Sequence, residues 1–294
     1  MVSCAQAQKT TFTNRRFERP NIIIILADDM GYSDIGCYGG EILTPNIDKL
    51  ASNGIRFKQF YNTARCCPTR ASLLTGLSPH QTGVGHMTEN PFEQTSENWG
   101  TAGYQGFLNK NCVTIAQVLQ GTGYHTYMSG KWHLGFHGED KWPKQRGFQK
   151  YYGILAGASS YFRPEGDRGL YYNNTKLPPP EEGYYTTDAF TDSAIAFVSA
   201  PKDETPFFLY LAYNAPHWPL QAKAEDIEKF KGIYDKGWDS IREIRYKKQL
   251  SLGIIDAKTT LSPRDSLVRA WKDLTKTEQF MQLKLVLWIR TSGS

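Results

Sequence analysis

The chain has 294 residues, of which 40% are hydrophobic and 21% charged. This composition is typical of a folded globular protein with a sizeable core, and it argues against a disordered chain. The formal net charge is +5, but the densest basic segment, residues 242–248, is interleaved with Glu243 and Tyr246, so we expect a solvated helix face there and no nucleic-acid partner.

The cysteines argue against a disulfide framework and against a zinc site. Their number is odd, and no pair has the spacing Cys-x-x-Cys. No segment reaches the roughly 20 apolar residues that are needed to cross a lipid bilayer. The five positions are Cys4, Cys37, Cys66, Cys67 and Cys112.

The first residues, Met1-Val2-Ser3-Cys4-Ala5, are similar to the end of a bacterial lipoprotein signal, in which the cysteine is lipidated after cleavage. The apolar core that precedes such a cysteine is absent, so either the true start lies upstream or the match is a chance tetrapeptide. We interpret residues 1–19 as a signal remnant or flexible tether. We therefore expect export to the periplasm or the outer membrane surface, with a possible lipid anchor.

The first predicted strand is the apolar run Ile22–Ala27, which is typical of a strand buried on both faces of a parallel sheet. It ends on Asp28 and Asp29. These two carboxylates would therefore lie at the carboxyl end of a strand, where open α/β sheets bind their ligands. Carboxylate oxygens suit a hard cation such as Ca²⁺, which takes six to eight oxygen ligands.

A helix is predicted next, from Thr44 as N-cap through Pro45 in the first turn to Gly54 at the end. The alternating residues 55–61 predict a strand. A further helix is predicted from Arg70 to Leu77, with Pro68 favouring its start, so Cys66 would lie at a helix N-terminus. Free backbone N–H groups and the positive end of the helix dipole favour an anion at that position.

The remaining pattern alternates helix and strand, and the segment 136–186, rich in Gly, Pro and Tyr, has little periodicity. Such alternation predicts an α/β fold with a mostly parallel sheet covered by helices on both faces. We interpret the aperiodic segment as a long surface excursion able to line a pocket. The further predicted elements are a helix at 114–120, a strand at 124–129, a helix at 187–199 and a strand at 207–213.

Two short motifs follow predicted strands and carry residues suited to anion chemistry. In the segment 130–135, Lys131 offers a fixed positive charge and His133 titrates near neutral pH. In the segment 214–219, two prolines stiffen the loop that carries His217, which makes this histidine a reasonable acid for a leaving oxygen. Taken alone, each residue is also compatible with an ordinary structural loop.

The segment Cys66-Cys67-Pro68-Thr69-Arg70, followed by an apolar run that closes on Thr75-Gly76, has the form Cys-x-Pro-x-Arg. It resembles the signature of type I sulfatases, in which the first cysteine is oxidised after translation to Cα-formylglycine. The resemblance extends over most of residues 20–275. It implies the fold of the alkaline phosphatase superfamily, a large α/β/α domain followed by a smaller subdomain. The segments that carry it are 21–29, 44–53, 66–76, 130–135 and 215–219.

The resemblance also implies a site and a mechanism. A hydroxyl of hydrated formylglycine 66 would attack the sulfur of an aryl or glycan sulfate ester, His217 would protonate the leaving alcohol, and His133 would deprotonate the second hydroxyl to release sulfate. A formylglycine-generating or sulfatase-maturating enzyme is then an implied partner. The implied ligands of Ca²⁺ are Asp28 and Asp29, and the implied catalytic residues are Cys66, Arg70, Lys131, His133 and His217.

The chain departs from the family pattern in its last part. The family has a further Asp-Asn pair for the metal, a second active-site lysine and a C-terminal subdomain, and none of these is found here. We interpret residues 20–278 as a sulfatase-like domain, incomplete at its C-terminal side, and 279–294 as an aberrant tail. A frameshift or premature stop is the favoured explanation, and a short homologue is the alternative. We therefore expect an open sheet edge and little sulfatase activity.

Two other functions stay open at this point. A phosphonate or phosphodiester hydrolase of the same superfamily is compatible with the Cys66 motif. A non-catalytic sulfatase remnant is compatible with the missing ligands.

Overall fold

The computed structural model describes residues 19–88 and 98–288, and side chains up to residue 283. Within this part a six-stranded sheet has the order β1-β6-β2-β3-β4-β5. The first four strands in this order, β1, β6, β2 and β3, are parallel to one another, whereas β4 is antiparallel to β3 and β5 is antiparallel to β4. The strands are β1 (Ile22–Leu26), β2 (His125–Lys131), β3 (Lys150–Ile154), β4 (Leu170–Tyr172), β5 (Thr175–Lys176) and β6 (Phe207–Ala212).

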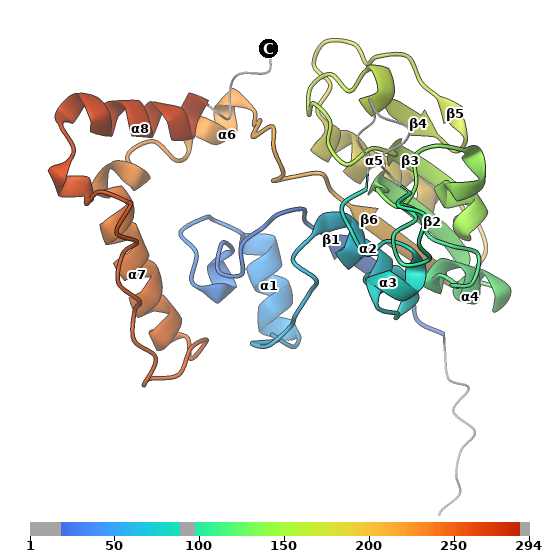
Figure 1. Cartoon of the computed structure of the whole chain (residues 1–294), viewed down its shortest axis with the longest axis horizontal. Coiled ribbons are helices and arrows are strands. Elements are labelled where there is room, and N and C mark those ends of the chain that lie inside the picture. The colour runs from blue at the N-terminus through green and yellow to red at the C-terminus, as the bar shows by residue number, and fades with distance from the viewer. Residues whose placement is uncertain (1–18, 89–97, 289–294) are drawn as a thin grey trace, which may run out of the picture.

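Helices cover the two faces of this sheet (Figure 1). On one face, Phe190 and Phe197 of α5 (Thr186–Ser199) pack against residues of β2, β3 and β6. On the other, Leu74 of α2 (Cys66–Thr75) and Ala116 of α4 (Ile115–Gly121) belong to a core that includes Tyr210. Full burial of a large apolar side chain such as Phe190 contributes about 1.5–3 kcal/mol. The predicted α/β class, a mostly parallel sheet between helices, is therefore confirmed.

Local sequence explains where α2 and α4 begin and end. Thr114 caps α4 by accepting a hydrogen bond from the backbone N–H of Gln117, whose side chain in turn bonds the backbone of Thr114. Proline is tolerated in the first turn of α2, where its missing N–H has no helical partner. Gly76 ends α2 with φ of 70°, a left-handed conformation that glycine adopts without strain.

Two predicted features of the first sixty residues are wrong. The strand β1 forms, but it is an edge strand of the described sheet, and Ile23 and Ile25 are 53% and 59% exposed rather than buried on both faces. The segment 55–61 forms no strand. Its apolar side chains are mostly exposed, with Ile55 at 83%. The helix predicted from Thr44 is found as α1 (Pro45–Asn53).

The segment 136–186 is also more ordered than its composition indicates. It contains β3, β4 and β5, whose shortness and Gly/Tyr-rich sequence leave no clear alternation. Several of its tyrosines lie inside the fold: Tyr151, Tyr161 and Tyr171 are all below 7% exposed. Only part of the segment remains a loop that lines a pocket.

The later helices lie away from the sheet, at the same end of the molecule as α1 (Figure 1). They are α6 (Ala224–Glu228), α7 (Gly237–Ser251) and α8 (Lys276–Trp288), and a short α3 (Pro79–Thr82) follows α2. The basic segment 242–248 lies on α7, as predicted for a helix face. The boundary proposed at residue 278 falls inside α8.

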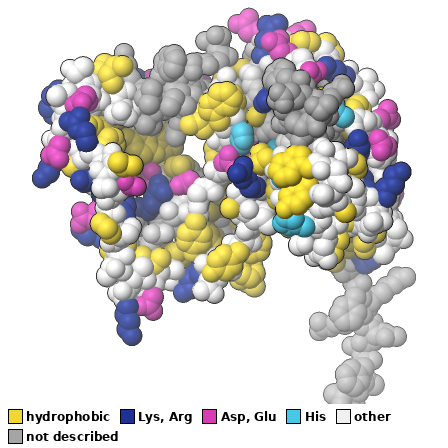
Figure 2. Space-filling model, viewed as in Figure 1, with side chains coloured by type: hydrophobic (Ala, Val, Ile, Leu, Met, Phe, Trp, Pro, Cys, Tyr) yellow, Lys and Arg dark blue, Asp and Glu magenta, His cyan; other side chains and the backbone are white. Residues whose placement is uncertain are grey.

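A group of ion pairs joins α7 to the region before α1. Arg245 contacts Glu41 at 2.7 Å and Asp34 at 2.9 Å, and the three side chains are 17–34% exposed. We call these residues the α7 ion cluster. Around α1, hydrophobic side chains remain at the surface (Figure 2), among them Leu50 at 68% and Phe60 at 73% exposed.

None of the helices in residues 19–88 and 98–288 is both long and apolar enough to cross a membrane. The segment 1–19, interpreted as a signal remnant or flexible tether with a lipid anchor at Cys4, lies outside the described residues except for Arg19. The end of the tail, 289–294, also lies outside them.

Candidate active site

The residues singled out in the sequence meet at one edge of the sheet. Asp28 and Asp29 follow β1, Lys131 ends β2, His217 follows β6, and Cys66 opens α2. Because β1, β6 and β2 are parallel, their carboxyl ends share this edge. The fold thus brings together side chains that are up to 189 positions apart (28 to 217).

A buried ion cluster forms the floor of the site. Both oxygens of the Asp28 carboxylate are paired: Oδ2 lies 2.5 Å from Lys131 Nζ and Oδ1 lies 3.1 Å from Arg70 Nη2. The side chains of these three residues are at most 5% exposed. Burial raises the pKa of Asp28, but the charges of Arg70 and Lys131 outweigh it and hold the pKa below its ordinary value. We call these residues the Asp28 ion cluster.

Close packing fixes the end of β2 that carries Lys131. Gly130 has φ of 115°, and a Cβ there would lie 1.9 Å from the backbone oxygen of Ala212 in β6. Arg70 donates from Nη1 to the backbone oxygen of Lys131 at 2.7 Å and to the Tyr210 hydroxyl at 3.4 Å. Any larger residue at 130 would separate β2 from β6 and displace this lysine.

Cys66 is half-buried beside this cluster. Burial raises the pKa of its thiol, but a hydrogen bond with His217 and the positive charges of Lys131 and Arg70 lower it more, so the pKa lies below the ordinary value. Its sulfur also lies 3.7 Å from Met87 Sδ. The surroundings of residue 66 therefore stabilise negative charge.

His217 is held above Cys66 by its loop. The hydrogen bond with Cys66 raises the pKa of His217, against the opposing effect of burial. Its Nε2 lies 3.6 Å from Asp29 Oδ2. The hydroxyl of Tyr161 donates to the backbone oxygens of His217, at 2.6 Å, and Asn214, at 3.0 Å. The loop is thus anchored from the segment 136–186.

His133 lies deeper than expected for a residue that exchanges protons with solvent. It is 2% exposed, and its Nε2 donates to the backbone oxygen of Thr88 at 3.0 Å. Burial and the charge of Lys131 hold its pKa well below the ordinary value. A Cβ at Gly157 would lie 2.6 Å from the imidazole ring, so glycine is required for the ring to lie there.

Two residues of the site have strained backbones. Asp29 and His133 have φ of 63° and 56°, in the left-handed region that non-glycine residues rarely adopt. Each such residue costs of order 1–3 kcal/mol, and such strain tends to occur at functional sites. Asp29 directly follows Asp28, and His133 lies two positions after Lys131. Both strained residues therefore lie next to the Asp28 ion cluster in the chain.

Two cavities flank Cys66. The first, of about 180 Å³, is lined by Asp28, Asp29, Cys66 and Arg70, and we call it the Asp28 pocket. The second, of about 150 Å³, is the Arg168 pocket. It is lined by Met87, Thr88, His133, Gly157, Ala158, Arg168 and His217.

Asp28 and Asp29 fit part of a calcium site. Carboxylates are the hard oxygen donors that Ca²⁺ prefers, and both line one pocket beside Cys66. They supply fewer oxygens than the six to eight that the ion takes, and residues 19–88 and 98–288 hold no group of three or more His, Cys, Asp or Glu side chains suited to a metal. The remaining ligands would have to be other oxygens, including water.

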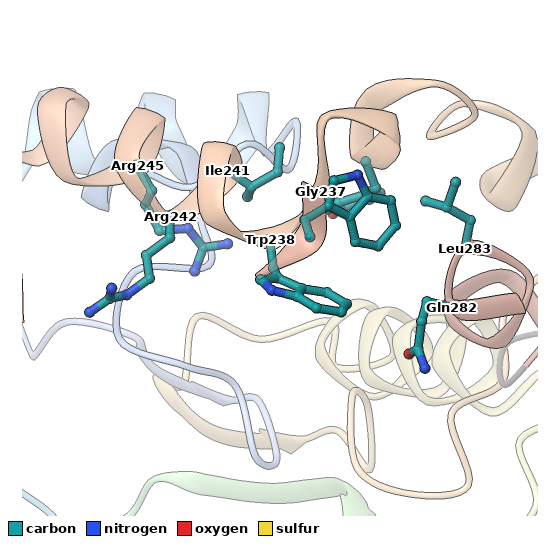
Figure 3. Close-up of a pocket in the computed structure, with 9 residues that line it drawn as sticks. Gly237, Trp238, Ile241, Arg242, Arg245, Gln282 and Leu283 are labelled. Carbon is teal, nitrogen blue, oxygen red and sulfur yellow. The ribbon is translucent and has the colours of Figure 1, made fainter. Parts of the chain in front are cut away.

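A larger cavity, of about 400 Å³, lies away from this edge between α7 and α8 (Figure 3). Its walls are mainly apolar, with Trp238, Ile241 and Leu283. The arginines that line it are already bonded: Arg242 to Ser262, and Arg245 within the α7 ion cluster. It holds no titratable pair suited to acid–base chemistry, so the sheet edge is the better candidate for the active site.

Sequence reasoning missed several residues of the site. Tyr210 contacts Arg70 from inside β6, Tyr161 anchors the His217 loop, and Thr88 and Arg168 line a pocket. None lies in a recognisable motif. The only signal was the position of Tyr161 and Arg168 in the aperiodic segment 136–186.

Comparison with known proteins identifies one family. A family model described as Sulfatase matches residues 20–277. An arylsulfatase of Klebsiella aerogenes is 38% identical over 277 residues, which cover 92% of this chain and 58% of that protein. The chain spans about half the length of the curated relatives it matches.

Solved structures agree with this match. Ps i-CgsB, in complex with k-i-k-neocarrahexaose, is 34% identical with a TM-score of 0.64, over 81% of this chain and 54% of that chain. BT4656, in complex with its substrate D-glucosamine-2-N,6-O-disulfate, is 29% identical with a TM-score of 0.55, over 72% of this chain and 38% of that chain. The fold similarity therefore extends through most of the described residues.

Proposed function

Because the chain belongs to the sulfatase family and has its alkaline phosphatase-like fold, we propose that it hydrolyses sulfate esters with residue 66 as the nucleophile. The observation that carries the proposal is the position of Cys66. It opens α2, beside the positive charges of Arg70 and Lys131 and within hydrogen-bond reach of His217. These are the groups that a sulfate and its leaving oxygen require.

We further propose that Cys66 is converted to formylglycine by a maturation enzyme. The hydrate of this group supplies two hydroxyls on one carbon, one to attack sulfur and one to expel sulfate. The site fits this use, because residue 66 is half-buried and its surroundings stabilise negative charge. Family membership supports the proposal, since formylglycine is general among these enzymes.

The residues around position 66 have separate roles in this proposal. Arg70 and Lys131 orient the nucleophile and offset the negative charge that develops on the sulfate oxygens, in a setting that excludes most water. His217, whose pKa is raised, donates a proton to the leaving alcohol oxygen. His133, whose pKa is lowered, is a neutral imidazole near pH 7 and can accept a proton in the second half of the reaction.

Asp28 and Asp29 would hold Ca²⁺ as two of its oxygen ligands. When bound, such an ion draws electron density from the sulfate oxygens. The proposal is supported by the donor type and by the pocket that the two carboxylates share with Cys66. Binding is measurable without turnover: Ca²⁺ should raise the melting temperature of the chain, and less so for Asp29→Asn.

The substrate class proposed is a sulfated glycan or an aryl sulfate. Support comes from BT4656, whose substrate is a sulfated glucosamine, and from the name of the Klebsiella aerogenes relative. A glycan substrate also agrees with the proposed export to the periplasm or outer surface, which rests on the lipoprotein-like Cys4 context. Fractionation of cells that express the full gene, with Cys4→Ala as control, tests the location and the lipid anchor.

The decisive experiment co-expresses the chain with a sulfatase-maturating enzyme and compares 4-nitrophenyl sulfate with 4-nitrophenyl phosphate. We expect slow hydrolysis of the sulfate, as the incomplete set of Ca²⁺ ligands predicts, loss of it in Cys66→Ser, and a peptide mass at residue 66 that shows formylglycine. Faster turnover of the phosphate would favour a phosphoester hydrolase instead. Formylglycine without hydrolysis of either ester would contradict the proposed activity of this chain.

A further inference from the structure

We propose that the Arg168 pocket is a subsite for a second anionic group, so that the preferred substrate is a sugar carrying a sulfate or carboxylate besides the one that is cleaved. This inference deepens the sulfatase function proposed above and rests on it for the position of the scissile ester. Its own basis is two side chains that the reaction at residue 66 does not use, Arg168 and Thr88, in a pocket that His133 and His217 also line.

The first observation is the charge of the pocket. Arg168 is half-buried, and one of its N–H groups donates to the backbone oxygen of Ala158 at 3.2 Å. No carboxylate pairs with it among the described residues, and no carboxylate lines the pocket. A guanidinium keeps its charge at any physiological pH and has five N–H donors in a planar fork, which suits a planar or tetrahedral oxyanion.

The second, independent observation is Thr88. This residue is only 2% exposed and lines the same pocket, yet its hydroxyl finds no hydrogen-bond partner in residues 19–88 and 98–288. A buried hydroxyl without a partner costs roughly 1–3 kcal/mol. An anion in the pocket would accept its hydrogen bond and remove that cost.

The third observation is that two residues of the pocket also contact residue 66. His217 lines the Arg168 pocket and also bonds Cys66, and Met87 lines it and contacts the Cys66 sulfur at 3.7 Å. In the proposed function the leaving oxygen faces His217, so a sugar ring attached to it would lie on the side of residue 66 where this pocket lies. With about 150 Å³ the pocket has room for a sulfate or carboxylate group, since a water molecule needs roughly 30 Å³.

Binding to the Cys66→Ser chain, which cannot turn over substrate, tests the subsite. The probes are D-glucosamine 6-sulfate and two disulfated forms, the 2-N,6-O and 3-O,6-O isomers, titrated by calorimetry. We expect at least one disulfate to bind about tenfold or more tightly than the monosulfate, because a hydrogen-bonded charge pair is worth that much. With Arg168→Gln added, the dissociation constants of the preferred disulfate and of the monosulfate should become nearly equal.

Three further variants separate recognition from structure. Thr88→Val keeps the shape but removes the hydroxyl, and should lower the preference severalfold. Arg168→Lys keeps the charge without the fork, and should restore part of the preference lost in Arg168→Gln. Arg163→Gln is the matched control, because Arg163 is 68% exposed and pairs with Glu165 on the same loop; it should leave the preference unchanged.

The outcomes distinguish the subsite from the sulfatase function. Equal binding of all three probes, or a preference that survives Arg168→Gln, would overturn the subsite, even if the matured wild type hydrolyses 4-nitrophenyl sulfate. If the preference depends on Arg168 but the matured wild type does not hydrolyse 4-nitrophenyl sulfate, the result would support the subsite and contradict the activity. No binding and no turnover would overturn both.

Discussion

Two ion clusters of three residues each lie in different surroundings and have different consequences. The Asp28 ion cluster has side chains at most 5% exposed, whereas those of the α7 ion cluster are 17–34% exposed. Charges that leave water completely pay a desolvation cost that pairing only partly offsets, so a buried cluster indicates a functional use of the charge. Charges that keep part of their water can simply join two segments, as Arg245 joins α7 to Glu41.

The largest difference between the clusters should appear when one carboxylate is neutralised. Asp28→Asn leaves Arg70 and Lys131 buried without a counter-charge, and we expect a loss of about 3–5 kcal/mol in the free energy of unfolding. Urea unfolding of wild type and variant measures it. A loss below about 1 kcal/mol would show that water reaches the cluster and that the comparison fails.

The second difference concerns the two cysteines that lie near the clusters. Without maturation, Cys66 should react with iodoacetamide severalfold faster than Cys37 at pH 7. The reason is that positive charges and His217 lower the pKa of Cys66 against burial, whereas burial and Asp48 raise that of Cys37. The rate at Cys66 should also persist to lower pH, because its thiolate does. Peptide mass spectrometry resolves the two sites.

Urea provides the control for this experiment. Once the chain is unfolded, the two thiols should react at similar rates. Equal rates in the folded chain would mean that the charges around Cys66 do not act on its thiol.

A smaller effect is expected for Glu41→Gln, the matched change in the α7 ion cluster. Arg245 keeps Asp34 as a partner and keeps part of its water, so the loss in the free energy of unfolding should be about 1 kcal/mol. The same urea experiment applies. A loss as large as that of Asp28→Asn would show that partial exposure does not protect this cluster from the cost of an unpaired charge.

The smallest expected effect is the response to salt. In 1 M NaCl, where charges are screened beyond roughly 3 Å, the difference between wild type and Glu41→Gln should shrink by a few tenths of a kcal/mol. The difference for Asp28→Asn should stay the same, since ions do not reach buried groups. If salt reduced the stability difference of both variants equally, the two clusters would not differ in their accessibility to ions.

Much of the fold could be predicted because local sequence and final structure agree there. The helices predicted at 70–77 and 114–120 form as α2 and α4, although α2 begins at Cys66, four residues before the predicted start, and ends at Thr75. The exposure of β1 could not be predicted, because the sequence of Ile22–Leu26 is compatible with both a central strand and an edge strand. Only the segments that pack around it determine how far it is buried. The strand predicted at 55–61 failed for the same reason: a strand needs a partner that local pattern does not specify.

The candidate site follows the same division. Residues in contiguous motifs, such as Cys66 and Lys131, could be found from sequence, and the rule for parallel sheets places them at one edge. Other features could not be predicted, because each depends on segments that meet only in the folded chain. They are the burial of His133, the two ion pairs of Asp28 and the pocket of Thr88 and Arg168.

The burial of the first turn of α2 would set an order of events if Cys66 is converted to formylglycine as proposed. Cys67, Pro68 and Arg70 are buried in the folded chain, although residue 66 itself is half-exposed. Any enzyme that reads these side chains in order to modify residue 66 must meet them while the segment is still unfolded. The proposed conversion would therefore compete in time with folding, and a chain that folds first would keep an unmodified thiol at the centre of its site.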